Sequence, residues 1–382
     1  MGYLEEKVKG LAEKLGFDAV GITSAEPFIE DEEASVARIG EGLLEGMAWI
    51  TEDRMRRAAR PEKALLGARS VISLAMSYYS GNFPNRGNGQ PRGRVARYAW
   101  GDDYHVVIKR RLRSFGEGLA GLADRPVKWR GFVDDGPMLD RAVARRAGVG
   151  WFGKSTNILT AGHGSWVFLA EVVTDLDLRP DEPLKKTCGQ CVRCMDACPT
   201  GAILAPYVID ARKCISYLTI ECRGPMPRPL RPLVGDWVFG CDVCQDVCPV
   251  NFKAEQSREP AFSRGNGFSA PALIPLLSMT DEQFRQMFRN SPIKRAKRVG
   301  LQRNVCVALG NLRDPSAVPA LATTLGEAEP LVRMHAAWAL GRIGGSEAAR
   351  ILQKVLAVER DETVIQEIRL ACNEVEGGAI RL

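Results

Sequence analysis

Histidine and long apolar segments are both scarce in this chain of 382 residues. Its three histidines, His105, His163 and His335, are too widely separated in the sequence to suggest a metal site. The longest apolar runs, such as 71–76 and 166–170, have the length of a β-strand and are too short to cross a bilayer as a helix. We therefore expect neither a histidine-based metal centre nor a membrane span.

A leader sequence is also not expected. Residues 1–6 show neither a charged stretch followed by an apolar one nor a twin-arginine motif, so we expect a cytoplasmic protein. The formal net charge of +6 is mildly basic, and part of the excess is concentrated near residue 294. With 45% hydrophobic residues, the chain has enough apolar content to bury the cores of two to four domains.

Cysteine, in contrast, is clustered. The first run, Cys188 to Cys198 followed by Pro199, has the spacing C-x2-C-x2-C-x3-C-P. The second run, Cys241 to Cys248 followed by Pro249, carries Val238 where its first cysteine would stand. In such runs three thiolates bind one [4Fe–4S] cluster and the fourth binds its neighbour. The two runs therefore predict two [4Fe–4S] clusters.

The second run is one ligand short, and we expect Cys214 to be the remote ligand that completes its cluster. The predicted ligands are Cys188, Cys191, Cys194 and Cys248 for the first cluster, and Cys198, Cys214, Cys241 and Cys244 for the second. Disulfides are disfavoured because we expect no leader, and zinc would leave the run of four unexplained. Cys222 stays unassigned, while Cys306 and Cys372 are expected in the apolar core.

Apolar periodicity divides the chain into an α+β part and a helical part. We expect helices at 4–16, 31–46, 104–122 and 138–148, and strands at 18–23, 70–79, 128–133 and 166–173. Interleaved strands and helices predict an α/β or α+β sandwich domain. The predicted domains are 1–180, a cluster domain at 181–255, a linker and helix at 256–290, and a helical region at 291–382.

The helical region contains an internal repeat. The segment 308–312 (ALGNL) recurs 31 residues later as 339–343 (ALGRI), and Leu321 and Leu325 recur at the same shift. This self-similarity is typical of stacked helix pairs of the HEAT kind. The final region is therefore predicted to be an α-helical, HEAT-like array.

A polar turn in the first domain is the candidate reaction site. A predicted strand ends in Asp134-Asp135-Gly136-Pro137, and a helix and a Gly-rich turn with Lys154 follow. Acidic and donor groups at a strand end are usual at ligand-binding positions. The alternative is a plain turn in which an aspartate caps the helix that begins near Met138.

A basic segment precedes the repeats. Its cations are Lys294, Arg295, Lys297, Arg298 and, further along, Arg303. On one helix these side chains could neutralise several phosphates of a nucleic acid. The alternative is an ordinary solvated face.

Taken together, these motifs resemble the epoxyqueuosine reductase family over nearly the whole chain. The motifs are 97–105 (RYAWGDDYH), 134–137 (DDGP), 146–154 (RAGVGWFGK), 164–171 (GSWVFLAE), the cysteine runs, 214–221 (CISYLTIE) and 292–298 (PIKRAKR). Each motif alone is weak, whereas their order and joint presence are specific. The family is an oxidoreductase family whose first domain resembles the corrinoid domains of reductive dehalogenases.

The resemblance implies an activity, cofactors and partners. It implies reduction of epoxyqueuosine to queuosine at the wobble position of tRNA, the last step of queuosine biosynthesis. Two [4Fe–4S] clusters would pass electrons to cobalamin, for which no protein axial ligand is expected, and Asp134 would supply a proton. We further expect an unidentified low-potential electron donor, no membrane partner and a monomeric protein.

The resemblance also implies individual binding residues. Those expected to line the cobalamin are Arg57, Arg97, Asp134, Lys154, Thr156, Asn157 and Ser216. Ser155 stands where many relatives carry Asn or His, so no side-chain contact is implied there. The basic segment would grip the tRNA anticodon stem-loop. Two alternatives stay open: a corrinoid reductive dehalogenase-like enzyme acting on a small molecule, and an electron-transfer protein that docks nucleic acid.

Overall fold

The computed structural model describes residues 3–84, 89–263 and 266–379, which divide into two compact units. Unit 1 contains residues 1–81, 101–212 and 242–264, and unit 2 contains 82–100, 213–241 and 265–382. Within the segment 181–255, residues 213–241 group with the helical region and the remainder groups with unit 1. The chain passes between the units several times, which sequence periodicity does not reveal.

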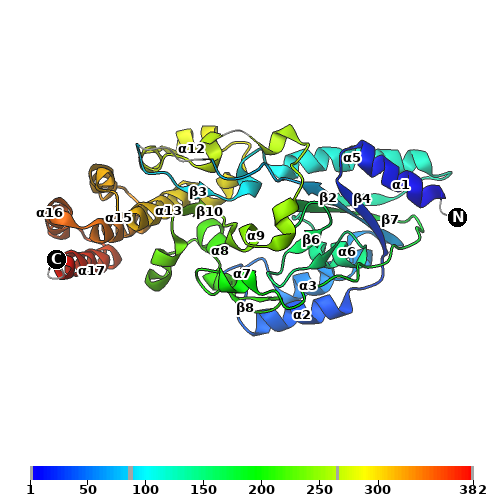
Figure 1. Cartoon of the computed structure of the whole chain (residues 1–382), viewed down its shortest axis with the longest axis horizontal. Coiled ribbons are helices and arrows are strands. Elements are labelled where there is room, and N and C mark those ends of the chain that lie inside the picture. Colours follow the sequence, from blue (N-terminus) through cyan, green and yellow to red (C-terminus); the bar gives the residue numbers. More distant parts are fainter. Residues whose placement is uncertain (1–2, 85–88, 264–265, 380–382) are drawn as a thin grey trace. The chain divides into compact units, whose positions relative to one another are not determined.

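Unit 1 is built on a four-stranded antiparallel sheet in the order β1-β2-β7-β4 (Figure 1). Its strands are β1 (Ala19–Ser24), β2 (Ser70–Ser77), β4 (Trp129–Phe132) and β7 (Val167–Thr174), with short pairs β5 (Gly150–Phe152) with β6 (Ile158–Thr160) and β8 (Ile203–Ala205) with β9 (Val208–Ile209). Its helices are α1 (Tyr3–Lys14), α2 (Ile29–Gly40), α3 (Glu52–Ala58), α4 (Pro61–Ala64), α5 (Tyr104–Leu122), α6 (Asp140–Arg146), α7 (Arg193–Asp196) and α9 (Val243–Asp246). This order confirms the predicted α+β class.

The two faces of this sheet carry separate apolar layers. Strand residues alternate between faces, so Val71 and Val173 pack with Ala142 and Val143 of α6 on one face. The helices α1 and α5 cover the opposite face. Gly21 is required on the α6 face, because a Cβ there would stand 2.0 Å from the carbonyl oxygen of Ala147.

All four predicted helices are present, but only one of them has the predicted bounds. The helix predicted at 4–16 spans Tyr3–Lys14. The helix predicted at 31–46 ends at Gly40, and the helix predicted at 138–148 begins at Asp140 and ends at Arg146. The helix predicted at 104–122 has those bounds. No helix in the described part of the chain combines the length and apolarity that crossing a membrane requires.

Unit 2 is mainly helical, with one short parallel strand pair, β3 (Arg94–Val95) and β10 (Trp237–Phe239). Its helices are α8 (Ile215–Ile220), α10 (Asn266–Ser269), α11 (Ile274–Leu277), α12 (Asp281–Met287), α13 (Lys297–Leu312), α14 (Val318–Thr324), α15 (Pro330–Ile343), α16 (Gly345–Leu356) and α17 (Glu362–Ala379). The helices α13, α15 and α17 pack in succession, with α14 and α16 beside them, as the repeat predicted.

The glycines of the repeat explain how closely these helices approach. A Cβ on Gly310 would stand 2.7 Å from the Trp338 ring and 2.9 Å from the Cα of Ala339. A Cβ on Gly341, one repeat later, would stand 2.7 Å from the Cβ of Ala371. Each glycine therefore lets the next helix of the array pack against backbone.

Gly310→Ala should lower the free energy of unfolding by about 1–3 kcal/mol, because the added methyl overpacks the α13–α15 contact. Gly300→Ala in the same helix is the matched control, since a Cβ there meets nothing closer than the Cβ of Ala296 at 4.0 Å. That control should raise stability by up to about 1 kcal/mol through helix propensity. Denaturant unfolding measures both, and equal effects of the two substitutions would contradict the packing role.

Candidate active site

The four thiols predicted to bind the first cluster come together in unit 1. Cys188 and Cys191 lie on a turn closed by the Cys191 amide, which donates to the Cys188 carbonyl at 3.0 Å, and Cys194 lies on α7. Burial raises the pKa of Cys194, and the nearby thiols of Cys188, Cys248 and Cys191 raise it further. Four thiols gathered in this way fit the ligand set of one [4Fe–4S] cluster.

The second predicted set is distributed over both units. Cys198 and Cys244 belong to unit 1, where α7 packs against α9, and the Asn157 amide nitrogen lies 3.8 Å from the Cys244 sulfur. Cys214 precedes α8 and Cys241 follows β10 in unit 2. The hydroxyl of Thr219 on α8 accepts a hydrogen bond from the amide of Gly240 at 2.9 Å. That bond holds together the two elements beside Cys214 and Cys241.

The remaining cysteines are structural in character. The Cys222 thiol donates to the Gly224 carbonyl at 3.6 Å. Cys306 is fully buried in α13, as predicted, whereas Cys372 is only half-buried. All eleven cysteines lie within the described ranges and none forms a disulfide. No group of three or more His, Cys, Asp or Glu among the described residues is placed to hold a single metal ion.

Asp134 lies exposed on the turn that follows β4. Its backbone has a φ of 52°, in the left-handed region that non-glycine residues seldom adopt. The Tyr104 hydroxyl donates to Asp134 Oδ2 at 2.5 Å, and the Tyr104 ring stacks on Phe168 at 4.2 Å. This strained, tethered carboxyl is the type of group found at reaction sites.

The alternative reading of the turn as a helix cap is wrong. The helix α6 begins at Asp140, its N-cap residue is Leu139, and no side chain caps it. Asp135 instead forms an ion pair with Lys109 of α5. Asp134 is therefore free of a capping role.

Two further carboxyls, Asp140 at the start of α6 and Glu171 on β7, were not predicted as site residues. Glu171 on β7 is fully buried, and its pKa is raised well above the usual range by burial and then by the charge of Asp140. Burial raises the pKa of Asp140 to about 6, and the charge of Asp134 adds to the effect. A charged residue inside the otherwise apolar strand 167–173 was the signal for this pair.

The Gly-rich turn after α6 is not a phosphate-binding loop, although its sequence matches the motif of one. Residues 148–155 spell G-x-x-x-x-G-K-S and contain G-x-G-x-x-G. A P-loop joins a strand to a helix, whereas this segment runs through β5 into a hairpin with β6. Lys154 donates to the Gly189 carbonyl at 2.7 Å, so it braces the first cysteine run.

The expected cobalamin-lining residues also fall in both units. Arg57, Lys154, Thr156 and Asn157 belong to unit 1, and Arg97 and Ser216 belong to unit 2. Arg57 is exposed and pairs with Asp53 at 2.8 Å. Thr156 has a φ of 71°, and its carbonyl accepts from Arg141 at 2.9 Å. Arg97 is buried, with its guanidinium over the Phe83 ring at 4.4 Å.

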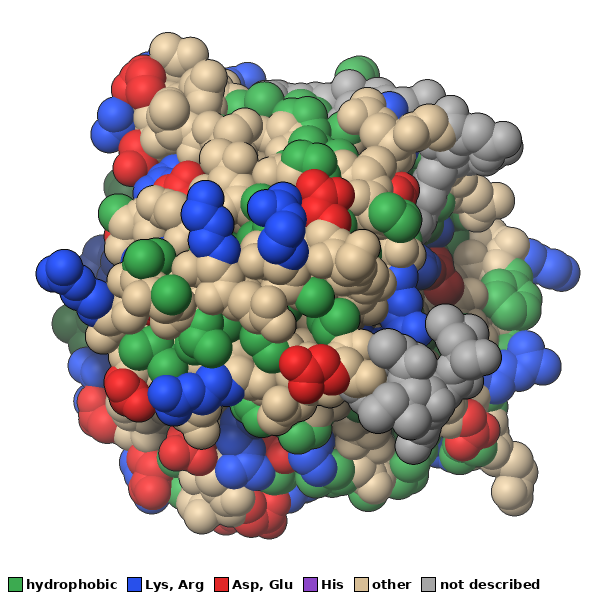
Figure 2. Space-filling model, turned by 90° about the vertical axis from the view of Figure 1, so that its left-hand side faces the viewer, with side chains coloured by type: hydrophobic (Ala, Val, Ile, Leu, Met, Phe, Trp, Pro, Cys, Tyr) green, Lys and Arg blue, Asp and Glu red, His purple; other side chains and the backbone are tan. Residues whose placement is uncertain are grey.

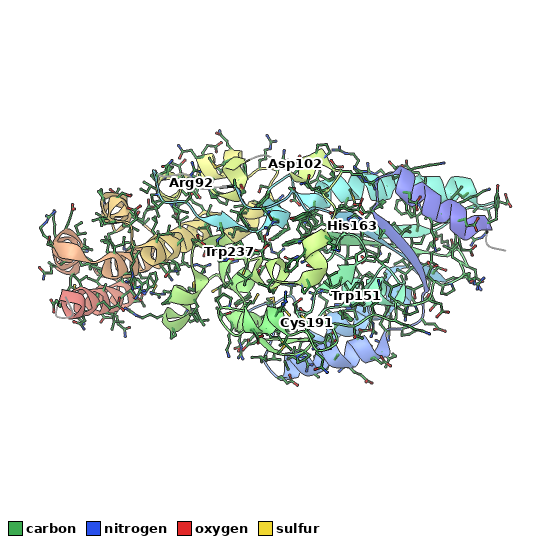
Figure 3. The ribbon with its side chains drawn as sticks, in the orientation of Figure 1. Arg92, Asp102, Trp151, His163, Cys191 and Trp237 are labelled. Carbon is green, nitrogen blue, oxygen red and sulfur yellow. The ribbon has the colours of Figure 1, made fainter. Side chains whose placement is uncertain are left out.

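Unit 1 offers buried polar atoms that suit a ligand rich in amides, as cobalamin is. Trp151 Nε1, Thr160 Oγ1 and His163 Nδ1 are buried and have no hydrogen-bond partner among the described residues. They come from β5, β6 and the turn before β7, and Figure 3 marks Trp151 and His163 in this part of unit 1. Buried donors and acceptors without partners are costly unless a bound group satisfies them. The residues present therefore fit such a group.

The basic segment does not form one helix. Lys294 and Arg295 lie on the 3₁₀ turn η6 (Pro292–Ala296), and α13 begins at Lys297, whose φ is 62°. Arg295 pairs with Glu221, and Arg298 pairs with Asp281 at 2.9 Å. On the face shown in Figure 2, basic and acidic side chains are interspersed.

The prediction that Arg303 contacts phosphate is wrong. Only 1% of its surface is exposed, and its guanidinium donates to the carbonyls of Leu218 at 2.6 Å and Cys222 at 2.7 Å. Asn304 next to it donates to the carbonyls of Thr219 and Val238 at 2.7 and 2.9 Å. These residues tie α8 and β10 to α13, so they support Cys214 and Cys241 instead.

Comparisons with known proteins agree with this site. Three family models match: "4Fe-4S double cluster binding domain" at 187–251, "Epoxyqueuosine reductase QueG, DUF1730" at 58–135, and "HEAT repeats" at 294–372. The epoxyqueuosine reductase of Escherichia coli (strain K12) is 40% identical over 345 residues, covering 90% of each chain. That of Bacillus subtilis (strain 168) is 34% identical over 368 residues, covering 96% of this chain and 94% of the relative.

Solved structures extend the likeness. An epoxyqueuosine reductase with a tRNA-Tyr epoxyqueuosine-modified stem loop has a TM-score of 0.91 and 33% identity, covering 98% of this chain and 99% of that one. A Bacillus subtilis structure, in which the catalytic aspartate loop is swung out of the active site, has a TM-score of 0.91 and 32% identity, covering 97% and 99%. A reductive dehalogenase has a TM-score of 0.37 and 16% identity, covering 79% and 36%.

Cys214→Ser should remove up to one cluster's worth of iron, because Cys214 completes the second predicted ligand set. Cys222→Ser is the matched control from the same segment, since its thiol bonds only a local carbonyl, and iron content should be unchanged. Iron and sulfide analysis of anaerobically purified protein measures both. The assignment is reversed if Cys222→Ser, and not Cys214→Ser, loses iron.

Proposed function

This chain belongs to the epoxyqueuosine reductase family, and on that premise we propose that it reduces epoxyqueuosine at the wobble position of tRNA to queuosine. In this reaction the epoxide gains two electrons and two protons, both carbon–oxygen bonds to the oxygen break, an alkene forms, and the oxygen leaves as water. Identity of 40% over 90% of the chain to a relative of this name supports reduction of a tRNA over a dehalogenase-like reaction on a small molecule.

The observation that carries this proposal is the pairing of an electron site and a proton site within unit 1. The thiol of Cys194 and the three thiols near it provide a cluster site, and Asp134 provides an exposed carboxyl on a strained turn. The reduction consumes electrons, which a cluster can pass on, and protons, which a carboxyl can donate. One compact unit therefore holds a site for each.

Two [4Fe–4S] clusters and cobalamin are the proposed cofactors, with an electron donor of low potential as the source of electrons. Cobalamin, when bound, supplies a low-valent cobalt centre able to reduce the substrate. The residues proposed to hold it in unit 1 are Arg57, Lys154, Thr156 and Asn157, with Arg97 and Ser216 from unit 2. The polar atoms of Trp151, Thr160 and His163 that lack partners support a bound group with many amides.

Asp134 is the proposed proton donor to the epoxide oxygen. The Tyr104 hydroxyl holds one carboxylate oxygen, Oδ2, so the other is left for the substrate. The left-handed backbone at Asp134 points to a turn that can adopt another conformation, as the swung-out aspartate loop of the Bacillus subtilis relative does. General acid catalysis of this kind contributes about 10²–10⁴-fold to a rate.

The tRNA is the proposed macromolecular partner, and the basic segment is its proposed docking surface. Lys294, Arg295 and Lys297 are exposed, and Arg298 is half-buried. The relative solved with a tRNA stem loop covers almost the whole chain, which supports a bound tRNA. Arg303 takes no direct part, because it is buried.

Asp134→Asn should lower alkene formation at least about 100-fold, because the amide cannot donate the acid proton. Iron content and cobalamin absorbance should stay at wild-type levels. Asp135→Asn is the matched control, since Asp135 is the adjacent exposed carboxyl and pairs with Lys109. Mass analysis of nucleosides from epoxyqueuosine-containing tRNA measures turnover, and undiminished turnover in Asp134→Asn would remove it as the donor.

Reversing Lys294 and Lys297 to Glu together should weaken tRNA binding and lower the slope of log affinity against log salt by about 1–2, through lost phosphate contacts. The control reverses Arg110 and Arg113, two exposed cations of α5 in unit 1, and changes the net charge equally. Binding titrations at several salt concentrations measure the slopes. Equal slopes for the two double variants would reject the basic segment as the tRNA surface.

A further inference from the structure

The first turn of α5 carries a histidine that has no part in the reaction as described so far. His105 is the second residue of this helix and directly follows Tyr104, whose hydroxyl donates to Asp134 Oδ2 at 2.5 Å. Of the three histidines, all within the described ranges, it is the one whose ring contacts a carboxylate. His105 is therefore a candidate for a role in the same reaction.

Asp103 fixes the orientation of the His105 ring. The carboxylate oxygen Oδ1 of Asp103, at the N-cap of α5, lies 2.8 Å from Nδ1 of His105. The same oxygen accepts the backbone amide of His105 at 3.1 Å, so backbone and ring are tied to one atom. Only 7% of the Asp103 side chain is exposed, so water competes little for this contact. Because a carboxylate only accepts hydrogen bonds, Nδ1 carries a proton and Nε2 points to other partners.

The His105 ring also lies against the residue that holds Asp134. The rings of His105 and Tyr104 stack with their centroids 4.1 Å apart and an interplanar angle of 28°. Tyr104 is buried, and its ring stacks on Phe168 at 4.2 Å as well. Its hydroxyl is thereby held in place on the Asp134 carboxyl. His105 and Asp134 are thus both in direct contact with one fixed tyrosine.

The outer nitrogen of the His105 ring, Nε2, is accessible. It has no hydrogen-bond partner among the described residues, and 30% of the His105 side chain is exposed. Lys109, one turn further along α5, is paired with Asp135, so its charge is offset. The Asp103 carboxylate offsets the positive end of the helix, which would otherwise oppose a charged imidazole. Imidazole is the side chain that ordinarily titrates near neutral pH, so it can carry and release a proton there.

The reduction consumes two protons, and Asp134 accounts for one of them. The epoxide oxygen leaves as water, so it must receive both protons while the same substrate is bound. After the first transfer Asp134 is a carboxylate and has no proton left to give. The second proton must then come either from solvent or from a second acid near Asp134.

We propose that His105 is this second catalytic acid and that Asp103 is the positioning residue for its ring. The inference rests on the proposed function. Asp134 protonates the oxygen as the first carbon–oxygen bond breaks, and Nε2 of protonated His105 protonates it as the second bond breaks. The proposed low-potential donor supplies the two electrons, the alkene forms and the oxygen leaves as water. Asp134 and His105 then each regain a proton from solvent.

Chemical rescue of the holoprotein tests the second acid. In His105→Ala, kcat should fall about 100-fold or more while KM for the epoxyqueuosine-containing tRNA is unchanged, because one acid is lost. Added imidazole should restore part of this rate in proportion to its concentration, since the ring it replaces is partly exposed. Val106→Ala, at the next and more exposed position of α5, should keep the wild-type rate with and without imidazole.

Asp103→Asn separates positioning from helix capping. Asparagine caps a helix about as well as aspartate, so a residue that only caps would lose neither stability nor rate. As a positioning residue, Asp103 should lose at least about tenfold in kcat in this variant, because the amide leaves the charged ring without its counter-charge. The midpoint of denaturant unfolding should stay at the wild-type value. An unchanged kcat in Asp103→Asn would remove the positioning role.

The outcomes distinguish this inference from the function on which it rests. Iron content and cobalamin absorbance at wild-type levels show that a variant is folded. If His105→Ala does not fold, His105→Gln replaces it, since its amide fills the space but transfers no proton. Wild-type kcat in the histidine variant, or a slow His105→Ala that imidazole does not restore, overturns the second acid while an inactive Asp134→Asn keeps the proposed function. A wild-type protein that forms no alkene overturns the function itself.

Discussion

The central constraint in unit 1 is the pairing of β7 with β2 on one side and β4 on the other. All eight residues of β7 pair with β2, from Val167 opposite Ser77 to Thr174 opposite Ser70. Because side chains alternate along a strand, this register sends Phe168 to the α5 face and Glu171 to the α6 face. Phe168 supports Tyr104, which holds Asp134, while Glu171 lies beside Asp140. A slip of one residue would exchange the two faces.

The cluster ligands are positioned by local hydrogen bonds and by buried polar contacts. The cysteine runs lie on short turns and on helices of a single turn, α7 and α9, so local backbone bonds shape the first ligand set. Cys214 and Cys241 depend instead on buried polar contacts. Arg303 and Asn304 donate hydrogen bonds to carbonyls of α8 and of the segments beside it. A buried polar network is stable only when its members have hydrogen-bond partners. The helix that carries these two residues is thus part of the cluster framework.

The repeat region supports the cluster ligands and carries the proposed docking surface for tRNA. Gly310 and Gly341 permit close approach of successive helices, and this packing builds the array that begins with α13. At the start of α13 the backbone turns at Lys297, which places the preceding cations on a 3₁₀ turn. On this one helix, Arg303 is therefore buried and bonds carbonyls of the protein, whereas Lys297 is exposed to solvent.

Much of this molecule follows from its sequence alone, where the information is local. Cysteine spacing, the 31-residue repeat, the bounds of α5 and the turn at Asp134 all depend on neighbours in the chain, so periodicity and short motifs revealed them. The division into two interleaved units, the burial of Arg303 and the meeting of Asp140 with Glu171 were decided by tertiary structure. They depend on contacts between residues that are distant in sequence. The identity of a charged residue does not show whether its side chain is solvated or buried against another polar group.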